Sequence, residues 1–302
     1  MFSIVKNYKG FFAITIIFLL VGIGSMVMRG FNLGIDFTGG SIIDLKFDNP
    51  VSVAQVRDVL KDHDLGNSII QLGNSNGQTT ESDSVLIRTG ILSDEDRHVV
   101  MQDLTSKLGE YKLLRVEQVG ATVGRELVEQ AAMAVVLSWI LMIIYITFRF
   151  EFKFATAAII ALMIDVLVVL SYFSLFQLEL DSSFVAALLT VVGYSINGTI
   201  VIFDRIRENL KGHRRSENLG EMVDRSIWQC MTRSIYTTLS TLFAIVAIFL
   251  FGGDTIHNFA FAMLVGFSSG FYTSTFLAGP MWKVLKLNSE GGKANVSKTK
   301  AV

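Results

Sequence analysis

The segment Val192–Asn209 reads VGYSINGTIVIFDRIREN and changes from an apolar helix into a charged one. Its apolar part is interrupted by Tyr194, Ser195, Asn197 and Thr199. One face of the predicted helix, at 3.6 residues per turn, carries Gly193, Asn197, Val201 and Asp204. Polar groups inside a bilayer usually face other helices or a water path. The segment therefore predicts a membrane span whose polar stripe serves either helix packing or function.

Long apolar blocks surround this segment, and hydrophobic residues make up 51% of the 302-residue chain. Together with a mean hydropathy of +0.50, these blocks predict a polytopic membrane protein rather than a soluble enzyme. A formal net charge of -1 argues against nucleic acid as a partner. The single cysteine, Cys230, excludes a disulfide within the chain.

Six segments are long enough to cross a bilayer, which takes about 20 helical residues. They are approximately 11–29, 130–148, 154–176, 183–203, 230–251 and 259–281. We expect the first to be an uncleaved span, because it lacks a clear signal-peptidase site. Lys and Arg are concentrated before the first span, in alternate connections and after the last. This asymmetry predicts cytoplasmic N- and C-termini and an extracytoplasmic polar block between the first two spans.

That polar block contains a strand and helix pattern of the order βαββαβ. The expected strands are 41–47, 68–72, 83–89 and 111–119, and the expected helices are 53–60 and 93–108. Ser52 is a plausible N-cap for the first helix. The order matches the ferredoxin-like split βαβ motif. The predicted fold class is thus an all-α bundle of six membrane spans with an inserted extracytoplasmic α+β ferredoxin-like domain.

The expected domains follow from these assignments. Residues 1–29 form the cytoplasmic N-terminus and first transmembrane helix, and 30–126 form the extracytoplasmic ferredoxin-like domain. Residues 127–286 form a region of five transmembrane helices, and 287–302 form a disordered cytoplasmic tail.

Motifs of catalysis and metal binding are missing from the sequence. It contains no G-x-x-x-x-G-K-[ST], no H-E-x-x-H and no cysteine cluster. We therefore expect neither an enzyme nor a resident metal or cofactor.

A few polar and small residues at bilayer depth are the candidates for function. Asp165 lies in the middle of the third span, and a charged, unpaired acid there costs several kcal/mol. We expect it to pair, to form hydrogen bonds or to be protonated, each of which suits ion coupling. The ion-coupling candidates are Asp165, Asn197, Thr199 and Arg233, and the helix-packing candidates are Gly193, Gly198, Gly266 and Gly270. The alternatives are a polar clamp for Asp165 and a snorkelling anchor for Arg233.

Several motifs together resemble the SecF family of bacterial protein-export membrane proteins, which belongs to the resistance-nodulation-division superfamily. They are GIDFTGG at 34–40, VGATVGREL at 119–127, VGYSIN with IVIFDRIREN at 192–209, and Phe251-Gly252-Gly253. The resemblance extends over about 33–282. Two positions differ from the family's usual pattern. Met163-Ile164 precede Asp165 where His-Asp is common, and Asn197-Gly198-Thr199 stands where Asn-Asp-Thr is common.

The resemblance implies a subunit that works with SecD and the SecYEG translocon in the bacterial cytoplasmic (inner) membrane. It implies use of the proton or sodium motive force to export unfolded polypeptide, with YajC and YidC as further candidate partners besides membrane lipid. One alternative is a structural assembly subunit without its own ion site, which Gly198 favours. Another is a small-molecule exporter of the same superfamily, although such exporters typically repeat the span-plus-domain unit within one chain.

Overall fold

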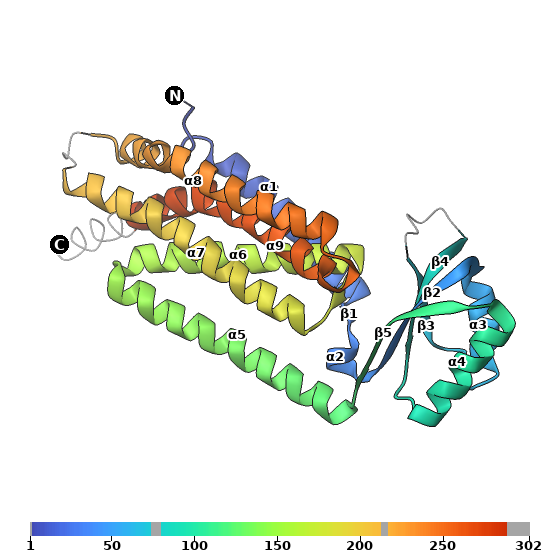
Figure 1. Cartoon of the computed structure of the whole chain (residues 1–302). Helices are drawn as coiled ribbons and strands as arrows, with labels where there is room; N and C mark the ends of the chain where they lie inside the picture. The colour runs from blue at the N-terminus through green and yellow to red at the C-terminus, as the bar shows by residue number, and fades with distance from the viewer. Residues whose placement is uncertain (1, 74–79, 213–216, 289–302) are drawn as a thin grey trace. The chain divides into compact units, whose positions relative to one another are not determined.

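The computed structural model describes residues 2–73, 80–212 and 217–288, and the chain divides into two compact units. One unit comprises the residues up to Asn32 together with those from Met133 onward. The other is Leu33–Ala132. Figure 1 labels most of their helices and strands. The tail expected at 287–302 lies outside the described residues after Asn288.

Six helices among the described residues are long and apolar enough to cross a membrane, which confirms the prediction of six spans. They are α1 (Tyr8–Arg29), α5 (Ala121–Arg149), α6 (Phe152–Phe176), α7 (Ser182–Lys211), α8 (Leu219–Phe251) and α9 (Asp254–Tyr272). The last continues through a π-helical turn, η1 (Thr273–Ala278), and remains helical to Asn288.

Several helices extend well beyond their predicted apolar limits. In the charged part of α7, polar side chains bond to one another: the Nε of Arg205 donates to Gln229 of α8 at 2.7 Å, and its Nη1 donates to Glu208 at 2.6 Å. Backbone hydrogen bonding within a helix does not require an apolar surrounding, so charged residues continue the same helices. Hydropathy alone locates the apolar part of each span but underestimates the helix.

Small residues allow the membrane helices to approach closely. A Cβ at Gly22 of α1 would lie 2.0 Å from the Ser171 hydroxyl of α6, and the hydroxyls of Ser25 and Ser174 are 2.9 Å apart. At the end of the bundle where α7 ends and α8 begins, Phe154 stacks on the buried Trp282 with ring centroids 4.6 Å apart. Tight packing of this kind fixes the helices around the residues of α6, α7 and α9 described below.

The second unit contains the expected order βαββαβ. Its elements are β2 (Gly40–Ser52), α3 (Val53–Lys61), β3 (Ile69–Leu72), β4 (Glu81–Thr89), α4 (Asp94–Leu108) and β5 (Tyr111–Val119). The strands lie in the order β3-β4-β2-β5, and each neighbouring pair is antiparallel. Ser52 caps α3 as predicted, in a capping box with Gln55. The short elements β1 (Asn32–Leu33), α2 (Ile35–Thr38) and β6 (Glu179–Leu180) were not predicted.

One face of this sheet is buried against the two helices. Alternate β2 residues Ile43, Leu45 and Phe47 form its centre and are at most 2% exposed. The helices contribute buried apolar residues from α3 (Val56, Val59, Leu60) and α4 (Val100, Leu104). The period-2 pattern of the strand and the helical spacing of its partners therefore produce this core.

The last two glycines of GIDFTGG lie where a side chain would be strained or would clash. Gly39 and Gly40 have φ values of +74° and +136°, which L residues rarely adopt. A Cβ at Gly40 would lie 2.6 Å from the Thr89 carbonyl oxygen. A Cβ at Gly124, in the VGATVGREL motif, would lie 3.2 Å from the Gly39 backbone nitrogen. The two glycine motifs thus pack against each other at the start of α5.

Replacing Gly40 by alanine is expected to destabilise this unit by about 2–4 kcal/mol, because backbone strain and a clash with a carbonyl combine. Pulse proteolysis of the purified chain in urea measures the effect as a lower midpoint for cleavage within residues 33–120. Gly90→Ala is the matched control, since a Cβ there meets nothing within 4 Å. Equal midpoints for the two variants would refute the steric explanation.

Candidate functional site

Asp165 lies at the centre of a hydroxyl cluster formed by α6, α7, α9 and η1. Its side chain is fully buried, and its Oδ2 accepts a hydrogen bond from Ser195 of α7. Ser269 of α9 donates to Oδ1 at 2.6 Å. Thr273, the first residue of η1, donates to Oδ2 at 2.8 Å and to Oδ1 at 3.0 Å. Three helices, namely α6, α7 and the continuous α9–η1 helix, therefore meet at one carboxyl group.

The described residues place no cationic side chain in this cluster. Among the described residues, no Lys, Arg or His side chain forms an ion pair or hydrogen bond with Asp165. A hydroxyl can donate to a carboxylate and can also accept from a protonated acid, because it carries one hydrogen and two lone pairs. The cluster can thus accommodate the acid with or without a proton by rotating its hydroxyls.

The π-helical turn coincides with this cluster. It begins at Thr273, the residue whose hydroxyl bridges both Asp165 oxygens. Single π turns inside α-helices are rare and are frequent at functional sites. Thr275 in the same turn and Thr199 on α7 each bury a hydroxyl that has no hydrogen-bond partner among the described residues.

A second polar site lies between α7, α8 and the α9–η1 helix. It is a small cavity of about 60 Å³ lined by Asn197 and Gly198 of α7, Arg233 of α8 and Ser274 of η1, among others. Two of the ion-coupling candidates, Asn197 and Arg233, therefore line the same cavity. No acid of the described residues forms a salt bridge with Arg233.

The structure separates the four ion-coupling candidates. Asp165 belongs to the hydroxyl cluster, while Asn197 and Arg233 line the second cavity. Thr199 is fully buried but does not bond to Asp165. The two sites adjoin each other at a close contact between helices. Gly270 lines the second cavity, and a Cβ there would be 3.0 Å from the Cβ of Ser195, which belongs to the Asp165 cluster.

Three of the four helix-packing candidates lie at helix contacts. A Cβ at Gly266 would be 2.2 Å from Val191, and one at Gly198 would be 3.3 Å from the Ser274 hydroxyl. Gly270 contacts Ser195 as described. Gly193 differs: a Cβ there would meet nothing within 4 Å among the described residues, so close packing at Gly193 is not found within this chain.

Sequence reasoning missed Ser269 and Thr273, which complete the Asp165 cluster. A signal was present, because SSGFYTST at 268–275 places six hydroxyl-bearing residues, including Tyr272, inside one span. Polar residues concentrated at bilayer depth normally face a partner within the bundle. In this span, only Gly266 and Gly270 were predicted to have a role, as helix-packing residues.

Known protein families match most of the chain. Residues 100–288 match the family described as protein export membrane protein SecD/SecF, C-terminal. Residues 24–51, which include Gly39 and Gly40, match the SecD/SecF GG motif. The two matched ranges contain the glycine motif, the Asp165 cluster and the Arg233 cavity.

Curated relatives and solved structures agree with these matches. The protein translocase subunit SecF of Acidaminococcus fermentans is 71% identical over 281 residues, covering 93% of this chain and 96% of the relative. That of Sebaldella termitidis is 39% identical and covers 94% and 92%. A crystal structure of SecDF, a translocon-associated membrane protein from Thermus thermophilus, aligns with a TM-score of 0.85 at 34% identity. This alignment covers 94% of the chain but only 38% of the SecDF chain.

Proposed function

Because the chain belongs to the SecD/SecF family of protein-export membrane proteins, we propose that it couples an ion gradient to polypeptide export as the SecF-type subunit of the Sec machinery. The proposed ion is the proton or sodium. The observation that carries the coupling proposal is the buried Asp165 carboxyl group, which accepts hydrogen bonds from three hydroxyls and bonds to no cationic side chain of the described residues. A group of this kind can change its charge during a cycle, whereas serine, threonine and asparagine side chains do not titrate at physiological pH.

SecD is the proposed partner. The match covers 38% of the SecDF chain, which supports a SecD-type unit as the partner that supplies the rest of such an assembly. Arg233 supports the same proposal, since a cation at bilayer depth is costly unless an anionic group neutralises it. We propose that SecD provides the acid facing Arg233 and the main ion site, which Asp165 and Arg233 tune. SecYEG, YajC and YidC are proposed as further partners on the resemblance alone.

Ion flux in liposomes tests this division of labour. The chain alone should conduct no protons or sodium ions above the level of empty liposomes, whereas the complex with SecD should conduct. Conductance by the isolated chain that disappears in Asp165→Asn would place the main site here instead. Absence of conductance in the complex as well would favour the alternative of an assembly subunit, which the glycine at position 198 supports.

The second unit is proposed to be a ferredoxin-like domain on the extracytoplasmic side. Its βαββαβ order and its strand order β3-β4-β2-β5 support the fold assignment. The distribution of basic residues supports the proposed orientation, in which both termini lie on the cytoplasmic side of a bacterial inner membrane. A ferredoxin-like fold does not by itself identify an activity. We propose that this domain binds unfolded polypeptide.

Cysteine labelling in cells is expected to show this orientation. In a background with Cys230→Ser, a cysteine at exposed Glu95 should react with a membrane-impermeant maleimide from outside. A cysteine at Gly212, at the end of α7, should react only after permeabilisation. Labelling of Gly212→Cys in intact cells would contradict the proposed topology.

Gly198→Asp, which restores the acid common in the family, is expected to be tolerated at a cost of about 1–2 kcal/mol. The position lines the same cavity as Arg233, and its nearest neighbour is the end of the Ser274 side chain, which can rotate. Gly266→Asp is the matched control, because its Cβ would overlap Val191. Membrane accumulation should stay normal for Gly198→Asp and fall for Gly266→Asp. Equal losses would show that position 198 is as tightly packed as position 266.

A further inference from the structure

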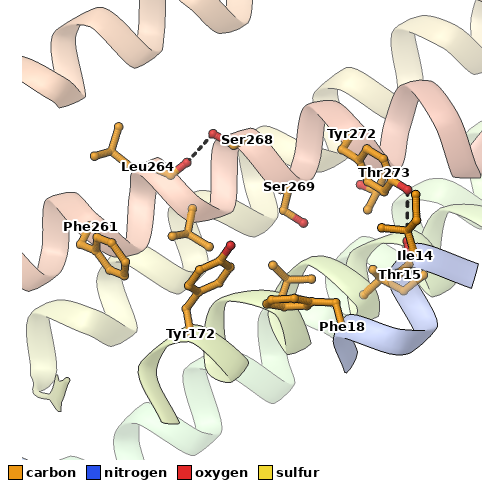
Figure 2. Close-up of a pocket in the computed structure, with 13 residues that line it drawn as sticks. Ile14, Thr15, Phe18, Tyr172, Phe261, Leu264, Ser268, Ser269, Tyr272 and Thr273 are labelled. Carbon is orange, nitrogen blue, oxygen red and sulfur yellow. Dashed lines mark hydrogen bonds between the residues drawn. The ribbon is translucent and has the colours of Figure 1, made fainter. Parts of the chain in front are cut away.

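A cavity of about 450 Å³ lies among α1, α6 and α9 (Figure 2). Some of the residues that line it also form hydrogen bonds with Asp165. This volume falls within the range of about 300–1,000 Å³ that is typical of small-molecule sites. The lining includes Ser269 and Thr273, whose hydroxyls donate to Asp165. The cavity and the buried carboxyl group are therefore separated by a single layer of hydroxyl groups.

The hydroxyls on this wall have already used their hydrogens. Ser268 donates to the Leu264 carbonyl at 2.7 Å, while Ser269 and Thr273 donate to Asp165. Since a hydroxyl carries one hydrogen and two lone pairs, these three hydroxyls offer a ligand acceptor capacity. A ligand that donates hydrogen bonds fits this wall better than one that only accepts them.

Charge favours the same kind of ligand. Asp165 forms no ion pair with any described residue, so an ionised carboxylate leaves a negative potential behind the hydroxyl layer. Electrostatic interactions are stronger in the low dielectric of a membrane bundle than in water. A single positive charge placed at Ser269 and Thr273 would complement this potential.

The rest of the cavity suits an apolar body. Phe18, Tyr172 and Phe261 form a continuous aromatic wall, with ring centroids 5.1 Å apart for the first pair and 6.3 Å for the second (Figure 2). Aromatic faces also attract cations within about 6 Å. The lining thus provides aromatic contacts as well as acceptors near a negative charge.

We propose that this cavity binds an apolar organic cation: a protonated primary amine with an aromatic or alkyl body. The ammonium group donates hydrogen bonds to the hydroxyl oxygens of Ser269 and Thr273, and the body packs against the aromatic wall. This site is distinct from the Arg233 cavity, which shares none of these residues. Arg233 would repel such a ligand from that second cavity.

Binding of tritiated phenylbutylamine to the purified chain in lipid nanodiscs tests the proposal, with empty nanodiscs subtracted. Phenylbutanol, which has the same body without the charge, is the matched competitor. The amine should bind at least about tenfold more tightly than the alcohol, since hydrogen bonds involving a charged group are the stronger ones. Asp165→Asn should reduce the affinity for the amine to that for the alcohol.

Val265→Phe places a larger side chain in the cavity wall and should weaken binding of both compounds about tenfold or more. Val246→Phe on α8, at a half-exposed position outside the cavity, is its control and should change neither affinity. Equal affinity for amine and alcohol in the wild-type chain would overturn the proposal. Tight amine binding that Val265→Phe leaves unchanged would also overturn it, by placing the ligand elsewhere.

Discussion

Replacing Arg233 by methionine is expected to abolish the stimulation of export by an ion gradient, while the chain still accumulates in the membrane. Methionine retains an unbranched side chain and removes the charge and the guanidinium hydrogen-bond donors. Arg233 lines a cavity with Asn197 and Gly198, and no acid of the described residues pairs with it. A permanent cation at this depth requires a neutralising group, which the proposal assigns to SecD.

Gradient-dependent export of a model polypeptide into proteoliposomes measures this effect. Arg225→Met is the matched control, because Arg225 is half-exposed near the start of α8 and pairs with Glu217 at 2.8 Å. It should export normally, and Arg233→Lys should retain part of the stimulation because it preserves the charge. If Arg233→Met supports normal export, the residue acts only as an anchor at the membrane interface.

Replacing Asp165 by leucine is expected to prevent stable folding, whereas asparagine should fold and lose most gradient-dependent export. Leucine leaves the hydroxyls of Ser195, Ser269 and Thr273 without their acceptor, and each such group costs about 1–3 kcal/mol. Asparagine offers an acceptor oxygen and an amide that hydroxyls can accept from, so the hydrogen bonds survive. It cannot change its charge, however.

Thermal unfolding in detergent and export in proteoliposomes separate the two effects. The asparagine variant should unfold close to the wild-type temperature and show strongly reduced export. Normal export by Asp165→Asn would identify the cluster as a structural clamp between α6, α7 and α9. If neither variant folds, Ser269→Ala and Thr273→Val, which each remove one hydrogen-bond donor, measure how export depends on the cluster.

The sequence was sufficient for features that depend on one segment at a time. Apolar length located the six spans, and alternating or helical spacing located the elements of the second unit, including the Ser52 cap. Asp165 was identified because it is the one acid within IALMIDVLVVL. Each of these signals lies in a continuous stretch, so no knowledge of neighbouring helices was needed.

The composition of the site depended on contacts between segments and could not be predicted in this way. Ser195, Ser269 and Thr273 meet Asp165 only because α6, α7 and α9 pack with particular rotations about their axes. The π turn shifts the register of the helix from Thr273 onward, so a regular period of 3.6 residues misplaces the hydroxyls beyond it. Thr199 was predicted as an ion-coupling candidate together with Asp165, yet its buried hydroxyl does not bond to the Asp165 carboxyl group.

Gradient-dependent export tests the central claim most directly. Proteoliposomes containing SecYEG, SecD and this chain are compared with and without an imposed proton or sodium gradient, and with the chain omitted. The account predicts that the gradient increases the amount of exported polypeptide only when SecD and this chain are both present. An increase of the same size without this chain, or none in the complete system, would contradict it.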